Sequence, residues 1–233
     1  MIEPNRNEIV EISQELIVSA HDIGHWLNLS PSSILANDDL ITSLILTATE
    51  IVEKYIWVSL RRKTIEAYYY LNDYYFSMVC TGNEKLLLNR SPIINISDIE
   101  KIEYLANDIW NEFDRGLLAS DGLYKNVTER IEKRGFASIY FIEPVTFESR
   151  ENAYKIRVTY KIGYDPIEIG PAYKLPALYK NAIMTIVAFH FTNRGDCESE
   201  CSLNGFPVPC AIKGQLDLVS LRNTIFGGSY EMC

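Results

Sequence analysis

The longest helical pattern in the chain covers residues 38 to 57, DDLITSLILTATEIVEKYIW, and constrains the fold more than any other segment. Its apolar side chains recur every three to four residues, the spacing of one side of an α-helix. One stripe consists of Leu40, Leu44, Ala48, Ile51 and Tyr55, and Ile41, Ile45, Val52 and Ile56 widen it. We expect the rest of the fold, or another subunit, to cover so broad an apolar side on more than one flank.

Two further helices are predicted at residues 20 to 28 and 175 to 194. Ser19 and Asp22 have the spacing of a capping box, in which each side chain bonds the backbone amide of the other residue. Pro176 marks the start of the later helix, because proline is tolerated in the first turn.

The segment between these helices, residues 60 to 164, is rich in β-branched and aromatic residues and is predicted to form strands. The clearest strand alternates Ile156, Val158, Tyr160 and Ile162 with Lys155, Arg157, Thr159 and Lys161. This period of two is typical of a half-buried antiparallel strand. Its basic stripe is either a solvated face or a contact to an acidic neighbouring subunit. Other strands are expected at residues 61 to 71, 73 to 80, 84 to 91, 92 to 105 and 136 to 149.

Residues 106 to 135 are expected to form an insertion of one or two short helices. Gly116 and Gly122 would break these helices and Gly135 would end them. A turn at residues 81 to 83, Thr-Gly-Asn, predicts a hairpin between the strands on either side of it.

The segment His21-Asp22-Ile23-Gly24-His25 is close to the H-E-x-x-H signature of zinc hydrolases. In a hydrolase Asp22 would be the general base, and His190 would complete a three-histidine site. The alternative is a capped surface helix whose histidines face away from the packed side. His190 then belongs to the apolar side of its own helix.

Five cysteines, an odd number, are expected to be reduced thiols in an intracellular protein. They are Cys80, Cys197, Cys201, Cys210 and Cys233. The spacing from Cys197 to Cys210 also allows a zinc site, although no second C-x2-C pair accompanies it.

Residues 196 to 233 form a tail with too few apolar residues to make a domain. We expect it to dock on the same chain or on a partner. Its candidate interface residues are Leu216, Leu218, Leu221, Ile225 and Phe226. The basic residues Lys155, Arg157 and Lys161 form a second candidate interface, toward another subunit.

The net charge of −9 argues against binding that depends on neutralising nucleic-acid phosphates. No stretch is apolar for long enough to span a membrane, and the N-terminal MIEPNRNEIVEIS is too polar for a signal peptide. We therefore expect a cytosolic product. The sequence contains no P-loop, Rossmann fingerprint or nucleophile elbow, and we expect neither enzymatic activity nor a cofactor.

Four segments, in order, resemble the head-to-tail connector, or neck adaptor, proteins of tailed bacteriophages. VSAHDIGHWLNL (18 to 29) resembles the opening helix of that family, with His25 at the position of its histidine. DDLITSLILTATEIVEKYIWVSL (38 to 60) resembles its long helix, and LNRSPIINISDIEKIEY (88 to 104) its Leu-x-Arg-x-Pro strand start. Residues 158 to 194 resemble its Val-Thr-Tyr strand, Gly-Tyr turn, Leu-Pro helix start and final Asn-Arg. The family's Thr-Gly-Arg after the long helix is replaced by Ile-Trp-Val here, and the 106 to 135 insertion and the tail have no counterpart.

The resemblance implies a virion protein that is made in the host cytoplasm and forms a ring, usually of twelve subunits, at the head-tail junction. The portal protein would lie above the ring and tail or further neck proteins below it. Genomic DNA would pass through without specific binding. A tail-completion or stopper protein of the same neck is an alternative, as is the metal-dependent hydrolase.

The expected fold is therefore α+β, with a helical core of connector type, an inserted antiparallel β region and an extended C-terminal tail. We expect an N-terminal arm (1 to 18), a connector domain (19 to 195) and a C-terminal docking tail (196 to 233).

Overall fold

The computed structural model describes residues 2–71, 85–106, 108–113, 127–131, 135–141, 154–165, 174–193 and 201–220. The chain divides into two compact units of similar size. The β unit consists of Met1–Ser13 and Arg62–Gly163, and the helical unit of Gln14–Arg61 and Tyr164–Cys233. The chain therefore crosses between the units at three places. Helices and antiparallel sheets are both present, so the α+β class is confirmed.

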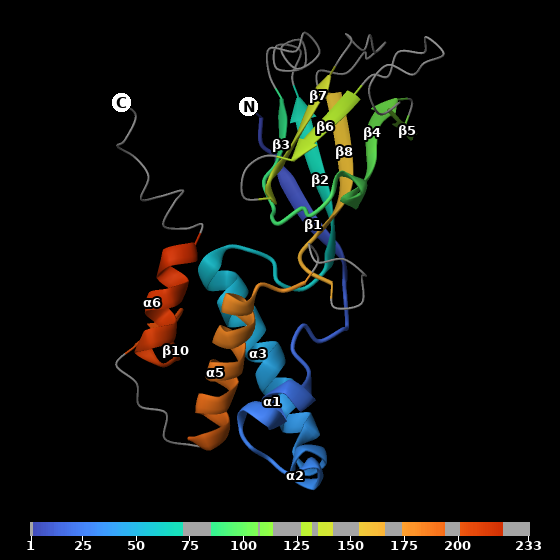
Figure 1. Ribbon diagram of the computed structural model, residues 1–233. Coiled ribbons are helices and arrows are strands. Elements are labelled where there is room, and N and C mark those ends of the chain that lie inside the picture. Colours follow the sequence, from blue (N-terminus) through green and yellow to red (C-terminus); the bar gives the residue numbers. More distant parts are fainter. Residues whose placement is uncertain are drawn as a thin grey trace, which may run out of the picture. The chain divides into compact units, whose positions relative to one another are not determined.

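The larger sheet of the β unit has five strands in the order β1-β2-β8-β4-β5 (Figure 1). The strands are β1 (Arg6–Ile12), β2 (Lys63–Leu71), β4 (Ile99–Ala106), β5 (Ile109–Glu112) and β8 (Tyr154–Ile162). Every neighbouring pair is antiparallel. The central pair, β2 and β8, is in continuous register from Lys63 opposite Ile162 to Leu71 opposite Tyr154.

A second sheet of three strands has the order β3-β7-β6. It consists of β3 (Leu86–Leu88), β6 (Val127–Ile131) and β7 (Ala137–Phe141). Buried side chains of both sheets form one core, and the predicted alternation of β8 is confirmed because its four apolar residues belong to it. The core includes Ile65, Ala67, Tyr69, Leu86, Leu88, Ile102, Ile139, Ile156, Val158, Tyr160 and Ile162.

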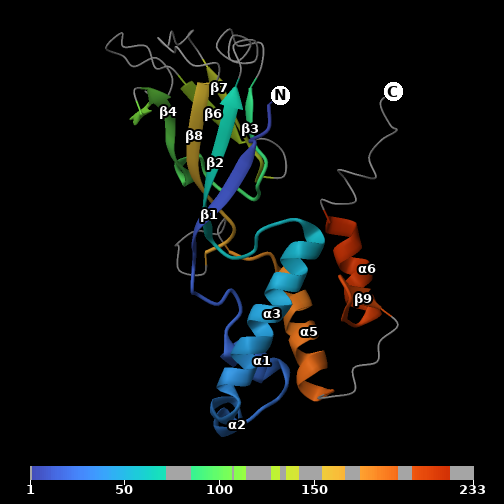
Figure 2. The ribbon, with the colours of Figure 1, turned by 180° about the vertical axis from the view of Figure 1, so that it is seen from behind.

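The helical unit is built around α3 (Asp38–Ile56), with α5 (Ala177–Thr192) beside it in both views (Figures 1 and 2). Its other elements are α1 (Ala20–Trp26), α2 (Pro31–Ala36), β9 (Ser202–Leu203), β10 (Phe206–Pro207) and α6 (Cys210–Val219). The fold itself covers α3 on several flanks, because α1, α5 and α6 all pack on it. The buried stripe of α3 is Ile41, Ile45, Ala48, Val52 and Ile56. Leu40, which was predicted within the stripe, is exposed, and Leu44, Ile51 and Tyr55 are half-buried.

The N-terminus of α1 confirms the predicted capping box. The amide of Asp22 donates to Ser19 Oγ at 3.0 Å, and the Ser19 amide donates to Asp22 Oδ2 at 3.4 Å. The short helix α2 was not predicted, although Ser30 caps it and Pro31 is its first residue. A Cβ on Gly24 would lie 2.1 Å from Ile34 Cδ1, so a larger residue at this position would force the Ile34 side chain to move.

Two predicted segments differ from the structure. The N-terminal arm is wrong for residues 6 to 12, because this segment is the edge strand β1, paired with β2. The helical insertion at 106 to 135 is wrong for residues 109 to 112 and 127 to 131, which are strands β5 and β6. These short segments are strands because they pair with β4 and β7. The prediction failed because these partners cannot be identified from the sequence of the segments alone.

Two details of the remaining strands also differ. The predicted strand at 92 to 105 begins only at Ile99, after a 3₁₀ turn (Ile96–Asp98) that Asn95 caps. The predicted hairpin turn at 81 to 83 and the strand at 73 to 80 lie outside the described residues. The strands that flank them, β2 and β3, belong to different sheets.

A buried ion pair between Arg62 and Asp98 lies where the chain enters and leaves the β unit. Arg62 Nη1 also donates to the Gly163 carbonyl at 3.2 Å, and the Arg62 carbonyl accepts from the Ser13 amide at 2.9 Å. The Asp98 carboxylate accepts from the amides of Ile94 (3.1 Å) and Asn95 (2.9 Å). A single arginine thus joins three chain segments at the boundary of this unit.

We expect Asp98→Ala to lower the free energy of unfolding of the β unit by about 3–5 kcal/mol, because Arg62 would keep a buried and unpaired charge. Trp110 is the one tryptophan of this unit, so its fluorescence in a W26F/W57F background reports urea unfolding there.

The matched control is Glu100→Ala, which removes the pair between Lys161 and Glu100, whose side chains are 40% and 36% exposed. Its expected cost is below about 1 kcal/mol. Equal losses in the two variants would contradict the role given to the buried pair.

Candidate assembly surfaces

The outer face of the five-stranded sheet is organised around Arg157 on β8. Its Nε donates to Glu103 Oε2 at 2.8 Å, and its Nη1 lies 4.0 Å from Glu66 Oε1. Its guanidinium lies 4.5 Å from the centre of the Trp110 ring, a cation–π contact. The hydrogen bond to Glu103 is the main cause that raises the pKa of Arg157, against a smaller opposing effect of burial.

The same face therefore contains carboxylates that neutralise the predicted basic stripe. Lys161 Nζ lies 2.7 Å from Glu100 Oε1, and Arg157 is engaged by Glu103. Among the described residues Lys155 has no ion-pair partner. The acidic partners of Arg157 and Lys161 thus lie on the same sheet, whereas one of the two alternatives expected them on another subunit.

On the helical unit, α6 is fastened to α3 by polar contacts around Tyr55. The Tyr55 hydroxyl donates to the Asp217 carboxylate, which also pairs with Lys213 Nζ at 3.0 Å. Ser220 Oγ donates to the Tyr55 carbonyl at 3.1 Å. The hydrogen bond from Tyr55 is the largest cause that lowers the pKa of Asp217, with Lys213 adding to it.

Apolar contacts of α6 continue this attachment. Ile212 and Leu216 are buried, with Leu216 at 0% exposure, whereas Leu218 is 87% exposed. Leu216 is therefore part of the chain's own core and is not available as an interface residue. This part of the tail docks on its own chain. Leu221, Ile225 and Phe226 lie outside the described residues.

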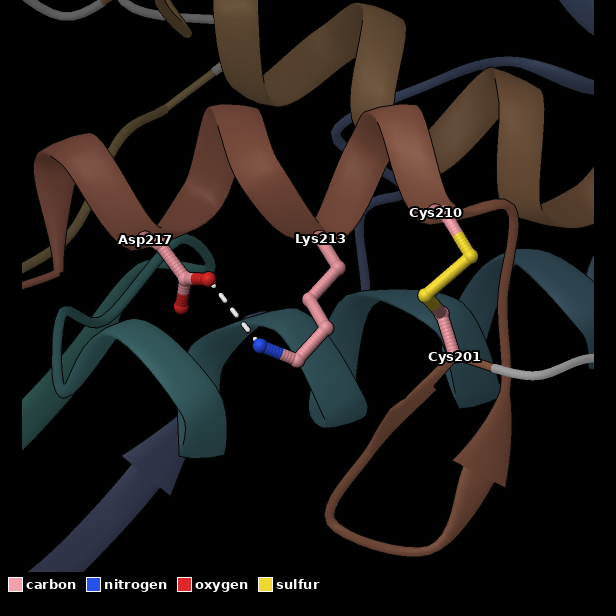
Figure 3. The surroundings of a disulfide bond; sticks show 4 residues. All are labelled: Cys201, Cys210, Lys213 and Asp217. Carbon is pink, nitrogen blue, oxygen red and sulfur yellow. Dashed lines mark hydrogen bonds and ion pairs between the residues drawn. A yellow bond between two sulfur atoms is a disulfide. The ribbon is translucent and has the colours of Figure 1, made fainter.

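A disulfide joins Cys201 to Cys210, the first residue of α6, with the Cα atoms 5.1 Å apart (Figure 3). The expectation of reduced thiols is therefore wrong for this pair, and these two sulfurs bind each other and not zinc. The tight β9–β10 hairpin between them brings the two residues together. Cys80, Cys197 and Cys233 lie outside the described residues.

The three histidines of the hydrolase alternative do not form one site in the described residues, where no group of three His, Cys, Asp or Glu could hold a metal ion. His21 and His25 are exposed on α1, with ring centres 4.4 Å apart. His190 Nε2 lies 2.8 Å from the Pro207 carbonyl, and its ring packs on Phe206. His190 is thus the helix-packing residue of the alternative interpretation.

Asp22, the general base of the hydrolase alternative, is occupied by other partners. Lys180 Nζ donates to Asp22 Oδ2 at 3.0 Å, in addition to the capping contacts with Ser19. Burial alone would raise the pKa of Asp22, but the hydrogen bonds from Lys180 and Ser19 outweigh it, and the pKa is lowered. A carboxylate held in its charged form by these donors is a poor proton acceptor near neutral pH.

The first three helices contain more acidic than basic residues. Between Gln14 and Glu53 the chain has six acidic residues and no Lys or Arg. Asp38 and Asp39 are both exposed in the first turn of α3. Within the part of the chain that the structure describes, no helix has the length and apolarity needed to cross a membrane.

We expect Leu216→Ala to lower the free energy of unfolding of the helical unit by about 2–5 kcal/mol, because it leaves a cavity under α6. Leu218→Ala, two residues away on the exposed side, is the control and should change it by less than about 0.5 kcal/mol. Urea unfolding followed by Trp26 and Trp57 in a W110F background measures both. A Leu216→Ala protein as stable as the control would show that α6 is not part of the core.

No protein-family model matches the sequence, and no curated protein matches it either. Among solved structures, a chain of the neck of an empty gene transfer agent (GTA) particle, computed with C6 symmetry, is similar to this protein. The TM-score is 0.55 at 12% sequence identity, and the likeness covers 90% of this chain and 94% of that chain. At this identity the likeness shows a shared fold.

Proposed function

We propose that this chain is a structural subunit of the neck of a tailed phage or phage-like particle. The observation that carries the proposal is the fold likeness to a neck protein over 90% of this chain and 94% of the other. Each unit makes up about half of the chain, so a likeness of this extent includes both of them. The order of the family-like segments in the sequence supports the same function independently.

The proposed subunit acts in a ring below the portal. The C6 symmetry of the similar neck fits rings of six or twelve copies, and we propose twelve, the number that the family resemblance implies. A closed ring requires each subunit to present two different and complementary faces. We assign these to the outer face of β8, with Lys155, and to the half-exposed flank of α3 that contains Leu40 and Leu44.

Contact with the portal is assigned to the end of the chain. Residues 221 to 233 contain Leu221, Ile225 and Phe226, and Leu218 before them is exposed. Apolar side chains of this kind stabilise a complex by about 25 cal/mol per Å² of surface that they bury. The role is mechanical and requires no cofactor. A stopper or tail-completion protein would have the same role at a different level of the neck.

Genomic DNA is proposed to pass through the ring without being bound. The net charge of −9 and the acidic helices α1 to α3 would repel phosphate groups. DNA can pass without being retained only if the ring makes few contacts to its phosphates. Each such contact increases the affinity for DNA and makes that affinity more dependent on salt.

We expect deletion of residues 221 to 233 to abolish binding to the portal protein of the same particle and to leave the thermal unfolding transition nearly unchanged. The deletion starts after the buried Leu216, so it removes no core residue among those described. Co-sedimentation with portal rings and calorimetry measure the two effects. A variant with residues 221 to 233 in scrambled order is the control for length and composition, and should also fail to bind. Undiminished portal binding by the deletion variant would overturn this assignment.

We expect Lys155→Glu to weaken ring assembly on the portal by about 10-fold, because it reverses a charge in the proposed subunit contact. Lys174→Glu, at an exposed lysine of the helical unit, carries the same charge change and should have little effect. Neither variant should alter retention of DNA in a gel shift, which we expect to be weak near physiological salt. Normal assembly of Lys155→Glu together with lost DNA binding would mean that the β8 face contacts DNA and not protein.

A further inference from the structure

The disulfide between Cys201 and Cys210 lies in a part of the helical unit that non-covalent contacts also hold in place. This part, the hairpin–helix element, consists of β9, β10 and α6, residues 201 to 220. Leu203, Val208 and Leu216 bury its apolar side, and His190 Nε2 contacts the Pro207 carbonyl at 2.8 Å. The element can therefore dock with its thiols reduced, and the disulfide adds a constraint to a structure that non-covalent contacts have formed.

The two sulfur positions suit oxidation after docking. Cys210 is exposed and Cys201 is half-buried, so a small reagent can reach the first of them. Cys210 is also the first residue of α6, where the positive end of the helix favours the thiolate, the form that attacks. The antiparallel pairs Phe206–Leu203 and Pro207–Ser202 bring both ends of the hairpin together. Lys213 points toward Asp217 and not toward the disulfide (Figure 3).

We propose that Cys201 and Cys210 are a redox-controlled lock, reduced while the subunit is made and assembled and oxidised after the particle leaves the cell. The timing rests on the proposed function, because cytosolic proteins keep their thiols reduced whereas released particles meet oxidising surroundings. The lock holds α6 against α3 after assembly. Residues 221 to 233, the proposed portal contact, follow α6 in the sequence after Ser220.

The oxidant in this proposal is a low-molecular-weight disulfide. The Cys210 thiolate attacks one of its sulfurs, which forms a mixed disulfide and releases one small thiol. The Cys201 thiolate then attacks the Cys210 sulfur, closes the protein disulfide and releases the second small thiol. Two protein thiols are oxidised, one small disulfide is reduced to two thiols, and no other reactant is needed.

The first experiment tests the lock in the purified full-length chain, without any partner. The chain is equilibrated in reduced or in oxidised glutathione, and hydrogen exchange of residues 211 to 219 is followed by mass spectrometry. Oxidation closes a loop of about 10 residues, so we expect exchange in α6 to slow by about 10- to 100-fold. A C80S/C197S/C233S variant, which retains only the proposed pair, should respond fully. A C201S/C210S variant should not respond. No slowing in the triple variant, or an undiminished response in C201S/C210S, would overturn the proposal.

The second experiment tests the timing. Free thiols are alkylated with N-ethylmaleimide in producing cells and in released particles, and the chain is analysed by mass spectrometry. We expect alkylated Cys201 and Cys210 in the cells and the intact disulfide in the particles. The same redox state in both would overturn the timing. Absence of the chain from released particles would overturn the proposed function and the timing, while the glutathione response would stand as a separate property of the chain.

Discussion

The structure depends on the way in which the chain is held where it passes from one unit to the other. In the β unit, Arg62 pairs with Asp98, donates to the Gly163 carbonyl at 3.2 Å and accepts from the Ser13 amide at 2.9 Å through its own carbonyl. In the helical unit, Glu53 Oε1 accepts from the amides of Leu60 at 2.6 Å and Arg61 at 2.8 Å. Each unit thus supplies hydrogen-bond partners to backbone groups of its own crossing segments. The five-stranded sheet contains β1, from before the first crossing, and β2, β4, β5 and β8, from after the second, so the segment between these strands belongs to the helical unit.

The sequence alone predicts the parts of this fold whose signals are local. The capping box of Ser19 and Asp22 and the alternation of β8 are confirmed, since each depends on neighbouring residues in the chain. Strands β1 and β5 are edge strands whose conformation comes from distant partners, β2 and β4, and their own sequences do not specify these partners. The short helix α2 was not predicted, although Ser30 followed by Pro31 is a local signal for a helix start.

The candidate surfaces show the same division between local and tertiary information. Periodicity correctly places Arg157 on the outer side of β8, but its partner Glu103 is 54 positions away and only the strand pairing identifies it. Leu216 and Leu218 have the same chemistry, and the docking of α6 alone decides that one is core and the other surface. A spacing of nine residues between Cys201 and Cys210 permits a disulfide, although it does not require one. The tertiary structure thus shows which candidate side chains are exposed and can contact another protein, and which are buried in the chain's own core.

The central claim, a structural subunit of a phage or phage-like neck, is tested most directly by cryo-electron microscopy of intact particles that contain this chain. The account predicts a ring of density at the head-tail junction, below the portal, into which the β unit and the helical unit fit in six or twelve symmetric copies. The portal should lie next to the segment after Ser220. The account would be contradicted if neither unit fits the density at the junction in particles that mass spectrometry shows to contain the chain.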